Sequence, residues 1–276
     1  MKEGTFSSAD GSQIYYRSVV PERSRGALIV LHGYAEHSGF YGPLMDRLSE
    51  RRVAVFTPDL RGHGRSARLL GYVDSLEALL EDIRRLHTSV REALPGLPVF
   101  LLGQSLGGTL ALLYASRHQE QLRGLVLSGG MVKLPAYASP FLVAVSGIVA
   151  RLLPRLPVQP FDYTRLCTDP AVTRALVEDE LYYKKKMRAR TGFVILESLR
   201  QVQKVLPGIR LPILILHGGE DVTVEPESAK VIEAGVSSPD RTKRIYPGAL
   251  HRIFDEPSCK EEALRTAVDW VEAHLA

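Results

Sequence analysis

Short, uninterrupted runs of apolar residues constrain the fold of this chain more than any other feature. Each run is rich in Val, Leu and Ile, and most of them stop at a Gly, Pro or His-Gly turn signal. Strands that are apolar along their whole length are buried on both faces, which is typical of parallel sheets in α/β proteins. The runs cover residues 27–31, 53–57, 99–102, 125–127 and 213–216.

Segments with helical character alternate with these runs. Residues 76–94 place apolar side chains at every third or fourth position, 106–116 is rich in Leu and Ala, and 261–275 predicts a closing helix. Shorter strands are expected at 14–19 and 244–246. The alternation predicts an α/β fold with a mostly parallel central sheet and helices on both faces.

The composition fits a soluble globular chain with a sizeable core. The chain has 276 residues, of which 45% are hydrophobic and 24% charged. Its formal net charge of +4 is only mildly basic, and no basic run is interleaved with aromatic residues. We therefore expect no nucleic-acid partner.

Cysteine usage and the absence of targeting signals favour a cytoplasmic protein. Cys167 and Cys259 lie far apart and predict neither a disulfide framework nor a metal site. The amino-terminal residues are polar, and no apolar run reaches the about 18 residues that a spanning helix needs. The expected location is therefore the cytoplasm. Association with a membrane through the segment 133–190 is a second interpretation.

One section, residues 133–190, interrupts the alternation. It has no clear strand, begins with an apolar stretch at 141–153 and ends in a basic cluster at 184–190. We predict that 133–190 is a largely helical cap or lid insertion that sits over the strand ends. The core then consists of residues 1–132 and 191–276.

The apolar stretch of the insertion has two interpretations. Its apolar residues occupy nearly all sides of a helix, so it could line a tunnel for an acyl chain or rest on a membrane beside Arg151 and Arg155. Alternatively, it packs on the core as a buried helix. The cluster at 184–190 could likewise face anionic lipid or solvent. The apolar residues are Phe141, Leu142, Val143, Val145, Ile148, Val149, Leu152 and Leu153.

A nucleophilic serine is predicted at Ser105. The segment 103–107 reads Gly-Gln-Ser-Leu-Gly and stands between an expected strand and an expected helix. This arrangement is typical of a tight strand-to-helix turn, where small residues keep the two elements from clashing. The helix N-terminus also favours a developing negative charge. A glycine-rich turn that contains a serine by chance is the alternative.

The base that a serine hydroxyl needs is predicted to be His251. Where a strand–turn–helix serine is used, the order along the chain is Ser, then acid, then His, and only His251 and His274 come late enough. His274 falls in the last turn of the closing helix, where a solvated histidine is expected. His251 lies in a loop after a strand, where such folds place catalytic groups.

The acid that orients the base follows the run at 213–216. Glu220 and Asp221 both lie there, and physical reasoning alone does not separate them. Asp59 is a weaker candidate for the acid, because it precedes Ser105 and lies in a turn.

An oxyanion hole is expected from two backbone N–H groups, those of Leu106 and Tyr34. Leu106 follows the nucleophile, and Tyr34 lies in the loop after the run at 27–31. His32, His63 and His217 lie near strand ends, and we interpret them as structural residues that brace their neighbours.

Several segments together resemble the monoacylglycerol lipase group of α/β-hydrolases. The strand-to-helix turn around Ser105 is common to many hydrolases, but the segments at 32–41 and 58–66 are more specific to this group. The segments are HGYAEHSGFY at 32–41, PDLRGHGRS at 58–66, GQSLGG at 103–108, DELYYKKKMRARTG at 179–192, HGGEDVTVEP at 217–226 and YPGALHRIFDEP at 246–257.

The resemblance implies an α/β-hydrolase fold and a lipid-ester hydrolase without a cofactor. It implies hydrolysis of a monoacylglycerol or related lipid ester through an acyl-enzyme on Ser105. By matching positions it favours Asp221 as the acid and His251 as the base, and it implies Tyr34 and Leu106 as the oxyanion donors. Two departures concern the site. Gln104 stands where the group commonly has His, and Tyr34 brings a bulky side chain to a loop position that is commonly small.

Other functions fit the same motifs. The same triad could serve a lysophospholipase, a general carboxylesterase or an acyltransferase. A non-catalytic ligand-binding member of the fold would usually lack one triad residue, and none is missing here. Dehalogenase and epoxide-hydrolase chemistry would need a carboxylate in place of Ser105.

Overall fold

The central sheet organises the whole molecule. The computed structural model describes residues 1–134 and 140–276, apart from the side chain of Leu142. Within these residues, an 8-stranded sheet has the order β1-β2-β4-β3-β5-β6-β9-β10. The strands are β1 Lys2–Ser7, β2 Gln13–Val19, β3 Gly26–Leu31, β4 Val53–Pro58, β5 Val99–Gln104, β6 Gly124–Ser128, β9 Ile213–Gly218 and β10 Arg241–Tyr246. All neighbouring pairs from β4 to β10 are parallel, whereas β1 and β2 extend the sheet antiparallel at one edge.

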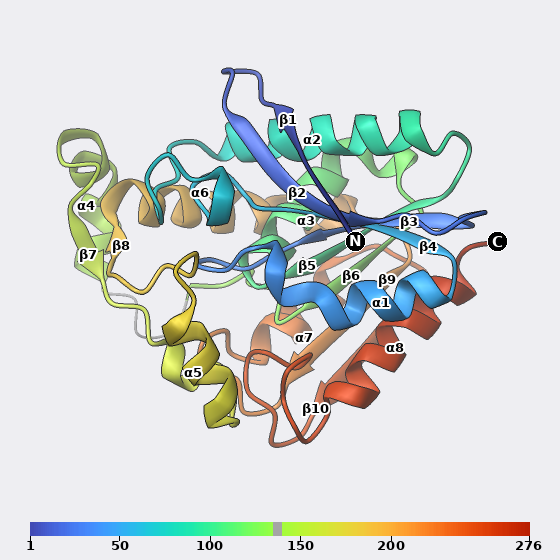
Figure 1. Cartoon of the computed structure of the whole chain (residues 1–276). Coiled ribbons are helices and arrows are strands. Elements are labelled where there is room, and N and C mark those ends of the chain that lie inside the picture. The colour runs from blue at the N-terminus through green and yellow to red at the C-terminus, as the bar shows by residue number, and fades with distance from the viewer. Residues whose placement is uncertain (135–139) are drawn as a thin grey trace.

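Helices cover both faces of the sheet (Figure 1). Side chains of β3 alternate between two buried clusters, with Ile29 in one and Val30 in the other. The first cluster holds the helices α2 Leu76–Ala93, α3 Leu106–His118, α6 Ala189–Val205 and α7 Glu227–Gly235. The second holds α1 Gly42–Glu50 and α8 Lys260–Ala273. The predicted parallel sheet with two helical layers is therefore confirmed.

The section between β6 and α6 lies outside this sheet. It contains α4 Pro140–Leu152, β7 Pro157–Gln159, α5 Pro170–Glu178 and β8 Met187–Arg188. Our expectation of no clear strand here was wrong, because β7 and β8 pair in an antiparallel two-stranded sheet. Strands this short carry no hydrophobic period that a sequence could show.

The extra section faces the carboxyl ends of the parallel strands, on the left of Figure 1. Tyr183 N–H donates to the carbonyl of Ala35, which follows β3, at 3.0 Å. Arg252 N–H, after β10, donates to the carbonyl of Leu166 at 2.8 Å. These backbone bonds attach the section to two loops at the sheet edge where a ligand of an α/β sheet is expected.

The first prediction concerns the contact between α3 and β3. A Cβ atom added at Gly107 would lie 2.0 Å from the carbonyl oxygen of Leu31, so Gly107→Ala must push the helix off the sheet. We expect a loss of about 2–3 kcal/mol in the free energy of unfolding, measured by urea titration. Gly42→Ala, in open space at the start of α1, is the control and should change stability by less than about 1 kcal/mol. Equal urea midpoints for the two variants would contradict this account.

Candidate active site

Ser105 occupies a strained turn between β5 and α3. Its backbone angles are φ 53° and ψ −117°, a region that residues other than glycine rarely adopt. Such strain costs about 1–3 kcal/mol and persists only where surrounding contacts enforce it. Here the Ser105 N–H donates to Ser128 at 2.9 Å, and its carbonyl accepts from the N–H of Met131 at 3.3 Å. The turn leaves Ser105 half-buried among neighbours that are buried.

His251 and Asp221 form a buried pair in the loops after β10 and β9. His251 Nδ1 lies 2.6 Å from Asp221 Oδ2. An ionised carboxylate only accepts, so Nδ1 carries the proton and the neutral ring keeps Nε2 as an acceptor. The other carboxylate oxygen of Asp221 accepts the N–H groups of Thr223 and Val224, both at 2.9 Å. The Asp221 carboxylate is therefore held from several sides while it bonds the imidazole.

The environment favours ionised Asp221 and a more basic His251. Burial raises the pKa of Asp221, but His251 and His217 outweigh this and hold that pKa well below its ordinary value. Burial lowers the pKa of His251, while the charge and hydrogen bond of Asp221 raise it, and the net pKa is raised. The ring is thus a better proton acceptor than a free histidine.

Two contacts bring the Ser105 and His251 segments together. Gln104, next to the serine, donates from Nε2 to the backbone carbonyl of His251 at 3.2 Å. Gly129, which follows β6, packs on the ring, because an added Cβ atom would lie 3.0 Å from His251 Cε1. The departure at position 104 therefore supplies an amide that supports the His251 loop.

The loop after β3 lies directly against Ser105. A Cβ atom at Gly33 would lie 3.2 Å from the Cβ of Ser105. Leu106, on the other side, opens α3, where backbone N–H groups have no partner within the helix. Both N–H groups predicted for the oxyanion hole, those of Tyr34 and Leu106, thus belong to segments that flank Ser105. Their role stays a prediction.

The side chain of Tyr34 belongs to an interface between the core and the section above it. Its ring packs edge-on against Phe161 at 5.6 Å and against Tyr183 at 6.1 Å between centroids. The residue is 6% exposed. The bulky ring that departs from the family pattern is therefore packed among aromatic side chains, and it forms part of the wall of the pocket at Ser105.

The competing candidates have other partners. Glu220 is exposed, whereas Asp221 is buried against the base. Asp59 accepts the backbone N–H groups of Ser38 and Arg65, both at 2.7 Å. His274, directly after α8, bonds Asp240, directly before β10, at 2.9 Å. None of these three touches the His251 ring.

The histidines interpreted as structural brace the loops. His32 Nε2 accepts from the N–H of Leu60 at 2.8 Å, and His63 Nδ1 lies 3.0 Å from the carbonyl of Arg61. His217 Nε2 lies 2.8 Å from the carbonyl of Val224 and also 3.2 Å from Asp221, so it touches the acid as well. This second contact was not foreseen.

An apolar pocket with an open volume of about 1080 Å³ meets Ser105. Its walls include Val145 and Val149 of α4, Phe161 after β7, and Phe193 and Leu196 of α6. No Asp, Glu, Lys, Arg or His is present in the part of its wall that the structure describes. Among the residues that the structure describes, no group of three or more His, Cys, Asp or Glu is arranged to hold a metal ion. The arrangement suits acyl transfer to a serine with an apolar acyl group.

Comparison with known proteins gives a consistent result. The profile of the family described as serine aminopeptidase, S33, matches residues 22–258. The chain is 30% identical over 274 residues to a monoacylglycerol lipase of Mycolicibacterium smegmatis, covering 99% of this chain and 98% of that one. It is also 30% identical over 272 residues to human monoglyceride lipase, covering 98% and 90%.

Solved structures agree on the fold. The crystal structure of Paleococcus ferrophilus monoacylglycerol lipase superposes with a TM-score of 0.86 at 28% identity, covering 95% of this chain and 99% of that one. A carboxyl esterase from Bacillus coagulans gives a TM-score of 0.88 at 21% identity, covering 100% and 99%. The predicted α/β-hydrolase fold is confirmed.

The second prediction uses the reactivity of Ser105 toward a fluorophosphonate, which requires neutral His251 to accept the serine proton. Because the pKa of His251 is raised, the labelling rate should fall as the pH drops through a midpoint above 6.5. Asp221→Asn removes the charge that raises this pKa, so its midpoint should move to lower pH and its plateau rate should fall by about 10⁴-fold. Glu220→Gln is the neighbouring control and should label like the wild type. A midpoint unmoved in Asp221→Asn would refute the role of Asp221.

Proposed function

Because the chain belongs to the hydrolase family described as serine aminopeptidase, S33, and matches monoacylglycerol lipases over nearly its full length, we propose that it hydrolyses monoacylglycerols. The observation that carries this substrate class is the wide, uncharged pocket that opens at Ser105. Ser105 is the nucleophile, His251 the base and Asp221 the acid. The section 133–190 is a cap inserted between the core segments 1–132 and 191–276.

Acylation uses each of these residues once. As the Oγ of Ser105 bonds to the ester carbonyl carbon, its proton passes to Nε2 of His251. The carbonyl oxygen gains the electron pair and is held by the N–H groups of Tyr34 and Leu106. The tetrahedral intermediate then breaks its bond to the glyceryl oxygen, which leaves with the proton from His251. The product is glycerol and an acyl-enzyme.

Deacylation repeats the cycle with water. His251 takes a proton from water as the water oxygen attacks the acyl carbon, and the same N–H groups hold the second oxyanion. The bond to Ser105 Oγ breaks, and His251 returns its proton to the serine. A fatty acid is released, and the site is regenerated without any further group.

The pocket favours an acyl chain over a peptide. Each methylene moved from water into an apolar pocket contributes about 0.8 kcal/mol, so a long chain gains substantial binding energy there. An aminopeptidase must instead bind the charged α-amino group of its substrate, for which a carboxylate is the natural partner. Within the described part of the chain, no carboxylate lines this pocket, which supports a lipid ester in preference to a peptide.

The third prediction tests substrate and nucleophile together. Wild-type protein should release fatty acid from a long-chain 1-monoacylglycerol, and Ser105→Ala should reduce the release by about 10⁴-fold or more. The variant should keep the wild-type unfolding midpoint, because only a half-buried hydroxyl is removed. An amino-acyl p-nitroanilide should not be cleaved.

The outcome also separates the alternatives. Hydrolysis of lysophosphatidylcholine or of short-chain esters in preference to monoacylglycerol would replace the proposed substrate but keep the triad. Full ester hydrolysis by pure Ser105→Ala would refute the nucleophile.

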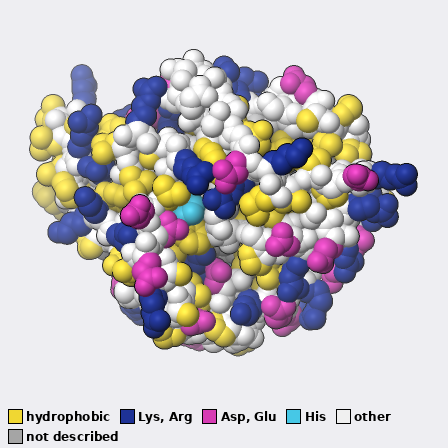
Figure 2. Space-filling model, in the orientation of Figure 1, with side chains coloured by type: hydrophobic (Ala, Val, Ile, Leu, Met, Phe, Trp, Pro, Cys, Tyr) yellow, Lys and Arg dark blue, Asp and Glu magenta, His cyan; other side chains and the backbone are white. Residues whose placement is uncertain are grey.

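The roof of the pocket suggests contact with a membrane. Helix α4 is apolar on two sides, because Val145 and Val149 line the pocket while Phe141, Ile148 and Leu152 are 65–71% exposed. Figure 2 shows hydrophobic side chains gathered over α4, with Lys and Arg side chains among them. Within the described residues, no helix is both long and apolar enough to cross a bilayer. We propose that α4 rests on the membrane surface and receives its substrate there.

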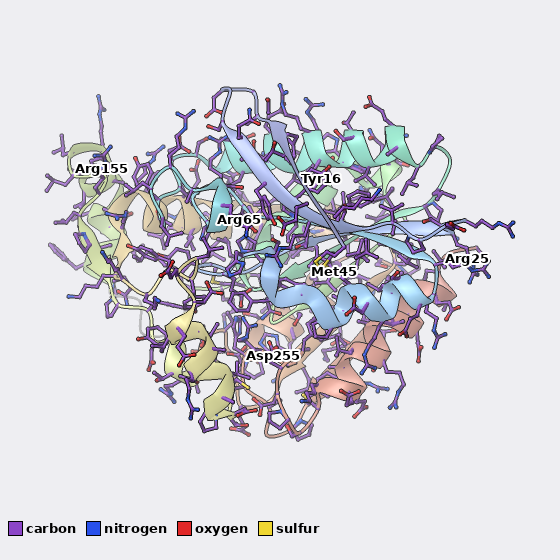
Figure 3. The ribbon with its side chains drawn as sticks, viewed as in Figure 1. Tyr16, Arg25, Met45, Arg65, Arg155 and Asp255 are labelled. Carbon is purple, nitrogen blue, oxygen red and sulfur yellow. The ribbon has the colours of Figure 1, made fainter. Side chains whose placement is uncertain are left out.

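The basic residues around α4 agree with a surface-bound orientation. Arg151 and Arg155 are exposed next to the outward apolar face. Arg155 is labelled at the outer edge of the molecule in Figure 3. Positive side chains beside a partly inserted apolar face add attraction to anionic lipid.

The fourth prediction measures this contact by co-sedimentation with phosphatidylcholine–phosphatidylglycerol vesicles. Ile148→Ser combined with Leu152→Ser should weaken vesicle binding by about tenfold or more, because two exposed apolar side chains are lost. Val20→Ser, 47% exposed between β2 and β3, is the control and should bind like the wild type. The double variant and the control should both hydrolyse a soluble short-chain ester at the wild-type rate. Equal vesicle binding by the double variant would exclude α4 as the contact.

A further inference from the structure

A buried ion pair outside the triad connects two loops of the site. Glu36 lies in the loop after β3, and Arg252 directly follows His251 in the loop after β10. A guanidinium nitrogen of Arg252 bonds Glu36 Oε1, and the residues are only 4% and 5% exposed. Buried ion pairs contribute little net stability, because both charges lose their hydration. The position of this pair therefore calls for another explanation.

Glu36 holds the loop that lies against the nucleophile. Its Oε2 atom accepts the N–H of Gly33 at 3.0 Å and the hydroxyl of Tyr41 at 2.9 Å. Gly33 precedes Tyr34 and contacts Ser105 closely. The carboxylate thus fixes the direction of the peptide that leads into the proposed oxyanion donor.

Arg252 holds the loop of the base. It donates from Nε to Asp255 Oδ2 at 2.9 Å, and its guanidinium lies over the ring of Phe40 at 4.8 Å. Its own N–H donates to Leu166 at 2.8 Å. Asp255, labelled in Figure 3, belongs to the same loop between β10 and α8. The guanidinium is therefore fixed by a carboxylate on each side.

We propose that the Glu36–Arg252 ion pair is a positioning device that holds the oxyanion loop and the His251 loop in one arrangement and balances the charge around the base. This inference rests on the serine-hydrolase mechanism proposed above, but not on the identity of the ester. Glu36 and Arg252 act through Gly33 and His251 rather than on the substrate.

The charges around His251 make the proposed charge balance testable. Asp221, supported by His217, bonds the ring from the loop after β9, and the negative charge of Glu36 acts on it from the loop after β3. Arg252, itself paired with Asp255, adds a positive charge from the base loop. Gln104 and Gly129, from the ends of β5 and β6, add no charge. Glu36 raises the pKa of His251 and Arg252 lowers it, so the two charges of the pair act on the ring in opposite directions, Glu36 more strongly.

Two variants separate charge from geometry. Glu36→Gln removes one negative charge and leaves Arg252 with Asp255 as its carboxylate partner among the described residues, so the acidic midpoint of the kcat/KM profile should move to lower pH by about one unit. Arg252→Lys keeps the charge but loses the planar fork that reaches both carboxylates, so the midpoint should stay. Both variants should lower kcat by about tenfold with little change in KM, because oxyanion contacts strengthen in the transition state.

The control is Glu261→Gln, which breaks the exposed pair between Glu261 and Arg47 on the outside of α8 and α1. It should leave kcat and the midpoint unchanged. A soluble p-nitrophenyl ester serves as substrate, and NMR titration of the His251 ring gives the midpoint without turnover. If wild-type protein turns over no ester but the His251 midpoint still moves in Glu36→Gln, the proposed function fails and the charge balance stands.

Two results would overturn the proposal. One is an unmoved His251 midpoint in folded Glu36→Gln. The other is a wild-type kcat in Arg252→Lys, which also decides the question if Glu36→Gln does not fold.

Discussion

The close approach of α3 to the sheet is the constraint on which the rest of the site depends. Gly103 and Gly107 leave no space for a side chain, since added Cβ atoms would lie 2.3 and 2.0 Å from backbone oxygens. Because helix and strand touch at this distance, the turn between them must be abrupt, and Ser105 takes up the strained backbone angles. The same proximity points the amino end of α3 at the position where an oxyanion would develop.

The parallel sheet then determines which other residues can join Ser105. The carboxyl ends of β3, β5, β6 and β9 meet at one edge, so the loops after them lie together although they are far apart in the chain. Asp221 and Glu36 are both buried there, and each meets a positive or basic group, His251 and Arg252. Buried charges in such a place need partners, and the partners link the loops to one another. The polar network thus holds these loops in one geometry.

Much of this could be predicted from local sequence, and the remainder depends on contacts between distant segments. The apolar runs predict the buried strands, and the positions of Ser105 and His251 after strands predict their place in the site. Strand β1 has no such run, because it is half-exposed at the sheet edge and is held by pairing with β2. Glu220 and Asp221 are adjacent acids of the same charge, and only the burial of Asp221 against His251 separates them.

The Glu36–Arg252 pair shows the same limit more sharply. Glu36 and Arg252 are 216 positions apart, and no local sequence pattern predicts that they pair. Glu36 occurs within a family-like segment, which suggested the loop but not the role of the carboxylate. Arg252 reads as an ordinary charged residue after a histidine. Only the folded chain reveals that this charge is buried. Because burying a charge is costly, its burial between two loops is what supports the positioning role that we propose for the pair.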